Sequence, residues 1–251
     1  MDIFFYCIAC IAIICFGLAS VGLLKGNKWT NVIGVIGVSC LLLLFAILWI
    51  FEQHPPMKTV WETRYLFACC SSLIGYVCCF HWKSRLIGWY GFLLSTVFLI
   101  LNIVKYDTFG HQLPMALQSI WYVPHVLVYM FGYAFLAIAA LIGIKGLFSR
   151  TDNVDKQDFM IQAGFSCQTI GMIIGAVWAK NVWGGYWTWD VKELWALISW
   201  LVYMLYIHFR ISHRNMIRLA QIVSVLAFLL VLFCWFGLNY VMQTESLHTY
   251  R

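Results

Sequence analysis

The segment 183–190, WGGYWTWD, carries the residue types best suited to binding a ligand. It holds four aromatic residues, two adjacent glycines and one acid within eight positions, between two long apolar stretches. The aromatic rings offer a flat apolar surface, and Gly184 and Gly185 allow a ligand to approach the backbone closely. Asp190 stands where it can cap a following helix. A membrane-surface aromatic belt is the alternative, because Trp and Tyr collect there without any ligand.

Histidines on both sides of this segment favour one particular flat ligand. His125 precedes it and His248 follows it near the C-terminus. Two imidazoles can bind iron from opposite faces of a porphyrin while aromatic rings cover its plane. His208 is a separate candidate, because it lies inside an apolar run and ionisable residues within membrane spans are costly and often functional. The alternative for each histidine is a polar side chain located at the lipid headgroups.

An all-α bundle in a membrane must position these residues. Charged residues make up 10% of the chain and hydrophobic residues 63%, whereas soluble domains are about 25% charged. A bilayer is crossed by about 20 apolar residues, and long spans without alternation must be helices rather than barrel strands. Eight transmembrane helices are therefore predicted from the charge-free runs 3–24, 29–51, 65–80, 86–104, 125–144, 159–179, 194–207 (completed by His208 and Phe209) and 219–244.

The distribution of basic residues predicts that both termini lie on the outer side, with no cleavable signal peptide. Inner connections then hold ten Lys and Arg residues: Lys25, Lys28, Lys83, Arg85, Lys145, Arg150, Lys156, Arg210, Arg214 and Arg218. Outer ones hold six: Lys58, Arg64, Lys105, Lys180, Lys192 and Arg251. This orientation accounts for the net charge of +6 without a nucleic-acid partner. The inner connection 146–158, with its run of charges, is expected to be solvated.

One transmembrane domain is expected over 1–251, with four N-terminal spans in 1–104 and the ligand-handling part in 105–251. The outer connections 51–64, 105–124 and 180–193 and the tail 241–251 are rich in Trp, Tyr, His and Pro. Functional residues concentrate on such connections when a rigid scaffold holds them. The site is therefore expected on the outer face.

The segment 183–200, WGGYWTWDVKELWALISW, resembles the tryptophan-rich WWD signature of the CcsA (ResC) type of cytochrome c biogenesis proteins. Segments 114–126, 203–210 and 236–248 resemble further parts of that family, so the resemblance covers roughly 110–250. The first hundred residues match loosely, through their spans and the loop 54–62. Lys192 and Glu193 after Asp190 favour CcsA over its relatives CcmC and CcmF. Val191 departs from the family pattern, which usually has proline after the acid.

The resemblance implies a role for each candidate residue. His125 and His248 correspond to external axial ligands of a haem iron, and His208 to the histidine that holds haem within the membrane. The haem-binding WWD residues would be Trp183, Gly184, Tyr186, Trp187, Trp189 and Asp190. No catalytic side chain is expected, because the protein would position haem b, bound non-covalently and in transit, for attachment to an apocytochrome.

The resemblance also implies partners and a location. A CcsB (ResB)-like membrane protein, an apocytochrome c and a thioredoxin-like thiol reductase are the expected partners, and the chain would be a subunit of a System II cytochrome c synthase. The expected location is the bacterial inner membrane, with the site facing the periplasm; a thylakoid membrane is the second choice. Three alternatives stay open: a haem exporter without a synthase role, a b-type electron-transfer cytochrome, and a scaffold whose tryptophans are only interfacial.

Overall fold

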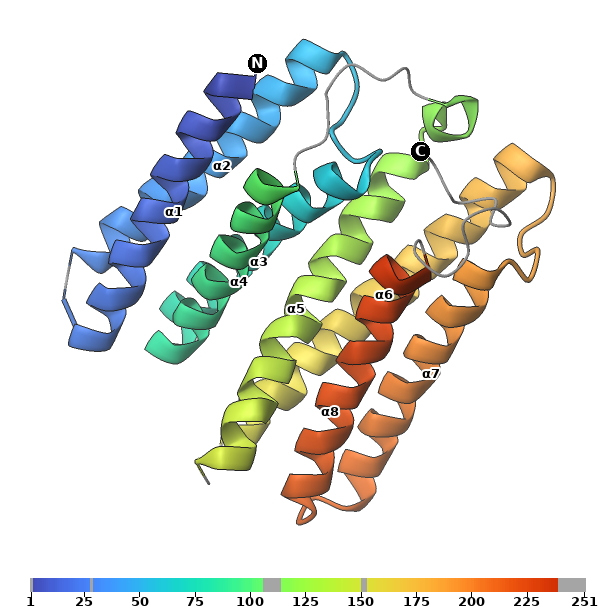
Figure 1. Cartoon of the computed structure of the whole chain (residues 1–251). Helices are drawn as coiled ribbons and strands as arrows, with labels where there is room; N and C mark the ends of the chain where they lie inside the picture. The colour runs from blue at the N-terminus through green and yellow to red at the C-terminus, as the bar shows by residue number, and fades with distance from the viewer. Residues whose placement is uncertain (1, 28, 106–113, 150–152, 239–251) are drawn as a thin grey trace. The chain divides into compact units, whose positions relative to one another are not determined.

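The computed structural model describes residues 2–27, 29–105, 114–149 and 153–238, and every regular element in these ranges is helical. The chain forms two compact units, 1–113 and 114–251. Figure 1 shows the helices in order along the chain. Eight helices are long and apolar enough to cross a membrane. The predicted all-α, eight-span membrane architecture is thus confirmed, while the side on which each terminus lies stays a prediction.

Unit 1 consists of four helices: α1 (Asp2–Lys25), α2 (Thr30–Glu52), α3 (Val60–Trp82) and α4 (Arg85–Val104). α1 packs against α2 and α4, and α3 packs closely along α4. At that last contact, a Cβ on Gly75 would lie 2.6 Å from the Cα of Gly91. Small residues let helix backbones approach in a membrane, where tight packing replaces the hydrophobic effect as the source of association.

A reciprocal pair of hydrogen bonds links the start of α3 to the end of α4. Trp61 Nε1 donates to the Asn102 carbonyl oxygen at 3.1 Å, and Asn102 Nδ2 donates to the Trp61 carbonyl oxygen at 3.0 Å. Both side chains are buried, and the Phe5 ring packs on Trp61 with centroids 4.6 Å apart. Buried polar groups need such partners, so this bond pair fixes one end of unit 1.

Unit 2 begins with a short 3-10 helix, η1 (Met115–Gln118), and continues with α5 (Tyr122–Phe148), α6 (Val154–Trp183), α7 (Val191–Ser212) and α8 (Ile217–Leu232). α8 ends in a π-helical turn, η2 (Phe233–Gly237). α5 packs along α6 and α8, and α7 packs against α8 and α6. The chain runs alternately up and down through these four helices, so α6 ends and α7 begins at the end of the unit where α5 starts (Figure 1). We call this the connector end.

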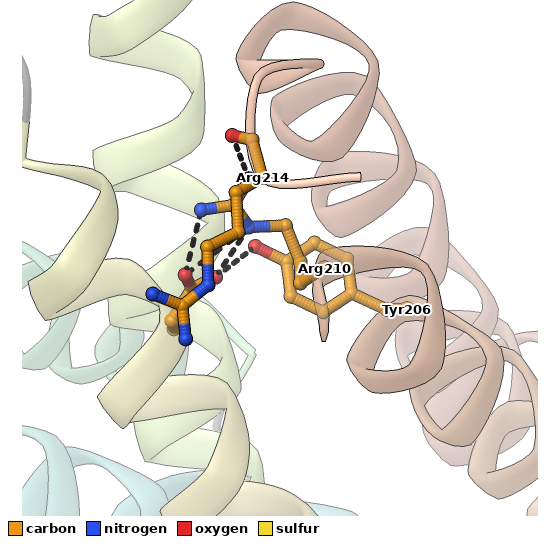
Figure 2. A network of polar contacts seen from close by, with 4 residues as sticks. Tyr206, Arg210 and Arg214 are labelled. Atoms are coloured by element: carbon orange, nitrogen blue, oxygen red, sulfur yellow. Dashed lines mark hydrogen bonds and ion pairs between the residues drawn. The ribbon is translucent and has the colours of Figure 1, made fainter. Parts of the chain in front are cut away.

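The opposite end of unit 2 corrects the expectation of a solvated connection at 146–158. α6 already begins at Val154, so Asp158 is a helical residue. Its carboxylate pairs with Arg210 of α7 at 2.9 Å and accepts a hydrogen bond from the Tyr206 hydroxyl at 2.7 Å. Arg210 also donates to the Arg214 carbonyl oxygen at 2.8 Å (Figure 2). The charge at this position therefore joins two helices instead of remaining in solvent.

Candidate functional site

The connector between α6 and α7 is shorter than the motif suggests, because Trp183 is the last residue of α6. Gly184 caps that helix in the left-handed region at φ 83°, a conformation for which glycine is strongly preferred. Lys180 Nζ donates to the Gly184 carbonyl oxygen at 2.7 Å and lies 5.6 Å from the centroid of the Tyr186 ring. One lysine of the last helical turn therefore fixes both the start of the connector and an aromatic side chain on it.

Glu193 holds the other end of the connector. Asp190 is the N-cap of α7 and forms a capping box with Glu193, so the predicted cap is confirmed despite Val191 at the position of the family's proline. The Glu193 carboxylate accepts hydrogen bonds from the backbone N–H groups of Thr188 at 2.8 Å and Asp190 at 3.2 Å. It also accepts one from the Thr188 hydroxyl at 3.2 Å. Trp189, which lies between Thr188 and Asp190, has a positive φ of 60°, which is uncommon for a residue with a bulky side chain.

The aromatic side chains of the connector are open to the surroundings but do not form one plane. Tyr186 is 60% and Trp189 70% exposed. The Trp187 and Trp189 rings meet edge to face, with centroids 5.9 Å apart and planes at 82°. The Trp187 Nε1 donor is buried and has no acceptor among the residues that the structure describes. The segment therefore presents two exposed rings rather than a continuous flat surface, and it keeps one indole donor buried.

His125 lies in the first turn of α5, at the connector end, with its ring fixed from several sides. Its Nδ1 is 2.9 Å from the carbonyl oxygen of Gly171 in α6. Because a carbonyl oxygen can only accept, the proton of the neutral ring must be on Nδ1, and Nε2 carries the lone pair. The ring also contacts Tyr129 and Trp178, with centroids 4.9 Å and 5.4 Å away.

A chain of ring contacts joins His125 to the tryptophan-rich segment. Trp178 of α6 contacts His125 on one side, and its centroid is 5.2 Å from that of Trp183 on the other. Trp178 Nε1 also donates to the Ala116 carbonyl oxygen of η1 at 2.9 Å. The structure thus brings the end of α6 against His125 and Ala116, which both lie much earlier in the sequence.

A distortion in α8 lies beside the first turn of α7. The ring centroid of Phe233, in the π-helical turn, is 4.6 Å from that of Trp195. Cys234 Sγ approaches the Lys192 carbonyl oxygen at 3.8 Å. Trp235 in the same turn contacts Tyr133 of α5, with centroids 5.8 Å apart. π-helical turns occur frequently at functional sites, and this one is in contact with both α5 and α7 near the connector end.

His208 lies far from this cluster. It is in the last part of α7, 17 residues after Val191, or roughly 25 Å along the helix axis from the connector end. Its side chain is exposed, on one face with Leu201 and Leu205, and its Nδ1 lies 2.9 Å from the Met204 carbonyl oxygen. His125 and His208 are therefore at opposite ends of unit 2 and do not share one iron.

The third predicted ligand, His248, lies outside the described residues, as does His111. Within the described ranges, no three His, Cys, Asp or Glu side chains converge on a metal position. A haem iron needs only axial ligands, since the porphyrin supplies the other four. The structure thus links His125 to Trp183 of the WWD segment through Trp178, and it leaves the pairing of His125 with His248 as a prediction.

Several residues of this cluster, Trp178 among them, have no site role predicted from the sequence. Glu193 could have been found, because an acid three residues after an N-cap is the signature of a capping box. Gly171 and Gly175 have the small-x-x-x-small spacing of close helix contacts. Lys180 gave no such signal, because a basic residue in the last turn of a helix is common.

Known proteins resemble this chain along nearly its whole length. Residues 4–245 match the family described as "Cytochrome C assembly protein", a longer stretch than the motifs alone indicated. The chain is 33% identical over 240 residues to the cytochrome c biogenesis protein CcsA of Chlamydomonas reinhardtii, covering 86% of this chain and 67% of that protein. It is 28% identical over 277 residues to CcsA of Mesostigma viride, covering 89% and 88% of the two chains.

A solved structure shares the fold. The cytochrome c haem lyase CcmF superposes with a TM-score of 0.72 at 16% identity, over 92% of this chain. This chain spans 45% of the length of CcmF, and the similarity concerns the fold alone. The family match covers nearly the whole sequence, both units included. The chain belongs to the cytochrome c assembly protein family.

Proposed function

We propose that this protein binds haem at the connector end of unit 2 and presents it for attachment to an apocytochrome c. Membership of the cytochrome c assembly family supports a role in cytochrome c maturation. The observation that carries the proposal is the state of His125: its Nδ1 bond to Gly171 puts the lone pair on Nε2. A histidine that ligates a metal typically donates its other ring N–H to an acceptor in this way.

The other residues of the cluster also fit a porphyrin. A Cβ on Gly184 would meet no described residue within 4 Å, so a flat ligand could lie against the connector backbone. Exposed Tyr186 and Trp189 supply apolar ring surface, and the Trp187 indole N–H is a donor suited to a propionate oxygen. In this proposal His248 supplies the second axial ligand. Haem b is the cargo and stays non-covalently bound while it is held.

The chemistry needs positioning rather than a nucleophilic side chain. Each cysteine thiol of the apocytochrome adds across one vinyl group of the haem: a carbon–sulfur bond forms, the thiol proton goes to the neighbouring vinyl carbon, and nothing leaves. No net electrons are transferred, but both thiols must be reduced, which is the task proposed for a thioredoxin-like reductase. The contribution of the WWD segment and His125 is to hold the vinyl groups where the two thiols can reach them.

His208 supports a second haem position and a partner protein. An imidazole on the outside of a membrane-spanning helix is costly next to lipid, and His208 is exposed together with the apolar Leu201 and Leu205. A helix of a CcsB (ResB)-like partner that covers this face would remove that cost. It would also supply the second ligand to a haem held within the membrane. In this proposal, haem moves from His208 to the external site.

For location we propose a multi-pass protein of the bacterial inner membrane with the connector end facing the periplasm. The basic residues at the opposite end of unit 2, among them Arg210, Arg214 and Arg218, support this orientation through the positive-inside rule. The corresponding reporter test is a C-terminal fusion. Alkaline phosphatase fused to the C-terminus should be active. A fluorescent protein that fluoresces only in the cytoplasm should give no signal when fused at the same position.

The test of the proposed function is haem content in the purified full chain and in its complex with the partner. His125→Ala and His248→Ala should deplete external haem and abolish cytochrome c assembly, while His208→Ala should deplete the intramembrane haem. His213→Ala is the matched control, because His213 follows α7 at the far end and stacks only on Phe209, 5.3 Å between centroids, in the described contacts. If all three site variants keep full haem content and full cytochrome c assembly, the assignment of these histidines as haem ligands is refuted.

A haem exporter is the second candidate, because it would use the same residues. The two functions separate when this chain, its partner and an apocytochrome are expressed together. An exporter gives external haem without thioether bonds, whereas the proposed synthase subunit gives covalently attached haem. A scaffold without haem would show no Soret absorption at all.

A further inference from the structure

At the connector end, the contact between α5 and α6 leaves no room for a Cβ at two positions of α6. A Cβ on Gly175 would lie 2.6 Å from Cε1 and 2.7 Å from Nδ1 of His125, and a Cβ on Gly171 would lie 2.6 Å from Cδ2 of Tyr129. Real Cβ atoms essentially never approach other heavy atoms this closely. The glycines are four residues apart on α6 and the rings four apart on α5, so two rings of one helix fit against two glycines of the other.

Glycine at position 175 exposes the acceptor that fixes the His125 ring, and glycine at position 171 accommodates the Tyr129 ring. In an α-helix the carbonyl of residue 171 points toward residue 175, whose Cβ would tilt back toward it. With glycine at 175 the imidazole reaches the Gly171 carbonyl oxygen, and the Nδ1 to oxygen distance is 2.9 Å. That oxygen has two lone pairs, so it can accept from the imidazole as well as from the helix backbone.

The ring has little freedom to avoid a substituent at position 175. Tyr129 contacts it with ring centroids 4.9 Å apart, and Trp178 with centroids 5.4 Å apart. Tyr129 itself lies against Gly171. A methyl group at 175 would therefore displace the imidazole from the Gly171 carbonyl, because the neighbouring rings block other movements.

We propose that Gly171 and Gly175 are positioning residues for the haem ligand His125. They admit its ring to the α6 backbone and lock the tautomer that has the proton on Nδ1 and the lone pair on Nε2. The role of the two glycines in haem binding rests on the proposed function. The tautomer of His125 in the protein without haem does not depend on that function.

The experiment uses the full chain with ¹⁵N-labelled histidine and two substitutions in α6. Gly175→Ala places a methyl group against His125. Gly164→Ala is the matched control, because a Cβ there meets the side chain of Leu136 at 2.6 Å in the same α5–α6 contact and leaves His125 untouched. Nitrogen chemical shifts of haem-free protein report the tautomer, and a haem titration followed at the Soret band reports affinity.

In the wild type and in Gly164→Ala, His125 should be neutral with the proton on Nδ1. In Gly175→Ala this tautomer should be lost, and haem affinity should fall by about 10- to 100-fold, as expected when the second hydrogen bond of a ligating histidine is removed. A wild-type His125 protonated on Nε2 would overturn the inference without any variant. So would Gly175→Ala with an altered tautomer and unchanged haem affinity. A wild type with the expected tautomer that binds no haem would instead overturn the proposed function.

Discussion

The carboxylate of Glu193 accepts a hydrogen bond from the backbone N–H of Thr188 at 2.8 Å, and this contact ties the first turn of α7 to the tryptophan-rich connector. It makes Glu193 a residue that supports the site through the backbone of the connector. The connector between these residues contains Trp189 in a strained backbone conformation. The ordering of the connector thus depends on a side chain outside the WWD motif.

Glu193→Ala should disorder the connector and weaken haem binding. Loss of a helix-capping interaction costs about 1 kcal/mol, and the variant also leaves the N–H groups of Thr188 and Asp190 without this acceptor. We expect protease cleavage within 184–190 to become faster and the haem Kd to rise about tenfold or less. Glu193→Gln keeps one acceptor oxygen and should lie between the wild type and Glu193→Ala. Identical cleavage rates in all three proteins would contradict this role.

Trp189 offers a variant in which haem retention should fall without any loss of stability. A non-glycine residue in the left-handed region costs about 1 kcal/mol or more, and Trp189 has a φ of 60°. Trp189→Gly should therefore leave the melting temperature unchanged or raise it, while haem retention falls because an exposed ring is lost. The pair of measurements is thermal unfolding and Soret absorbance on the same sample. A large loss of stability would show that the ring is needed for folding instead.

The ion pair between Asp158 and Arg210 should be structural and unrelated to haem. The two side chains are 20% and 11% exposed, so removing one partner leaves a largely buried charge. Asp158→Asn should destabilise unit 2 by about 2 kcal/mol, below the 3–5 kcal/mol of fully buried pairs. The double variant Asp158→Asn with Arg210→Met should recover part of this loss in thermal unfolding. If the double variant loses more unfolding free energy than the two single variants lose together, the pairing is contradicted.

The face of α7 around His208 should bind haem only in the complex. His208 is exposed in this chain, so one imidazole is available there and the second ligand must come from the partner. We expect the isolated chain to hold haem only at the external site, and the complex to hold additional haem that is lost in His208→Ala. Equal haem stoichiometry in the isolated chain and in the complex would disprove the need for a partner ligand.

The sequence predicted the helices well and the details of the site incompletely. Eight charge-free runs sufficed to predict eight spans, because a membrane span needs apolar length and little else. Helix boundaries depend on contacts that a local pattern does not contain: the charge of Asp158 is typical of a loop, and its partner Arg210 lies 52 positions later. Asp190 as a cap was predictable because capping is local.

What could not be predicted depends on packing between helices. The ring contacts from His125 through Trp178 to Trp183 need the register of α5 on α6, which no local pattern supplies. The same holds for Gly171 and Gly175, whose spacing indicates a close helix contact without naming the residue that fits there. The perpendicular arrangement of Trp187 and Trp189 also differs from the flat surface that their composition suggested.

The most direct test of the central claim is low-temperature electron paramagnetic resonance of the ferric haem in the intact protein. Two imidazoles on one iron give a low-spin spectrum, and His125→Ala and His248→Ala should each convert the external haem to a high-spin form or remove it. His213→Ala should leave the spectrum unchanged. If the low-spin signal of the external haem persists at full intensity in both His125→Ala and His248→Ala, these two residues are not its ligands.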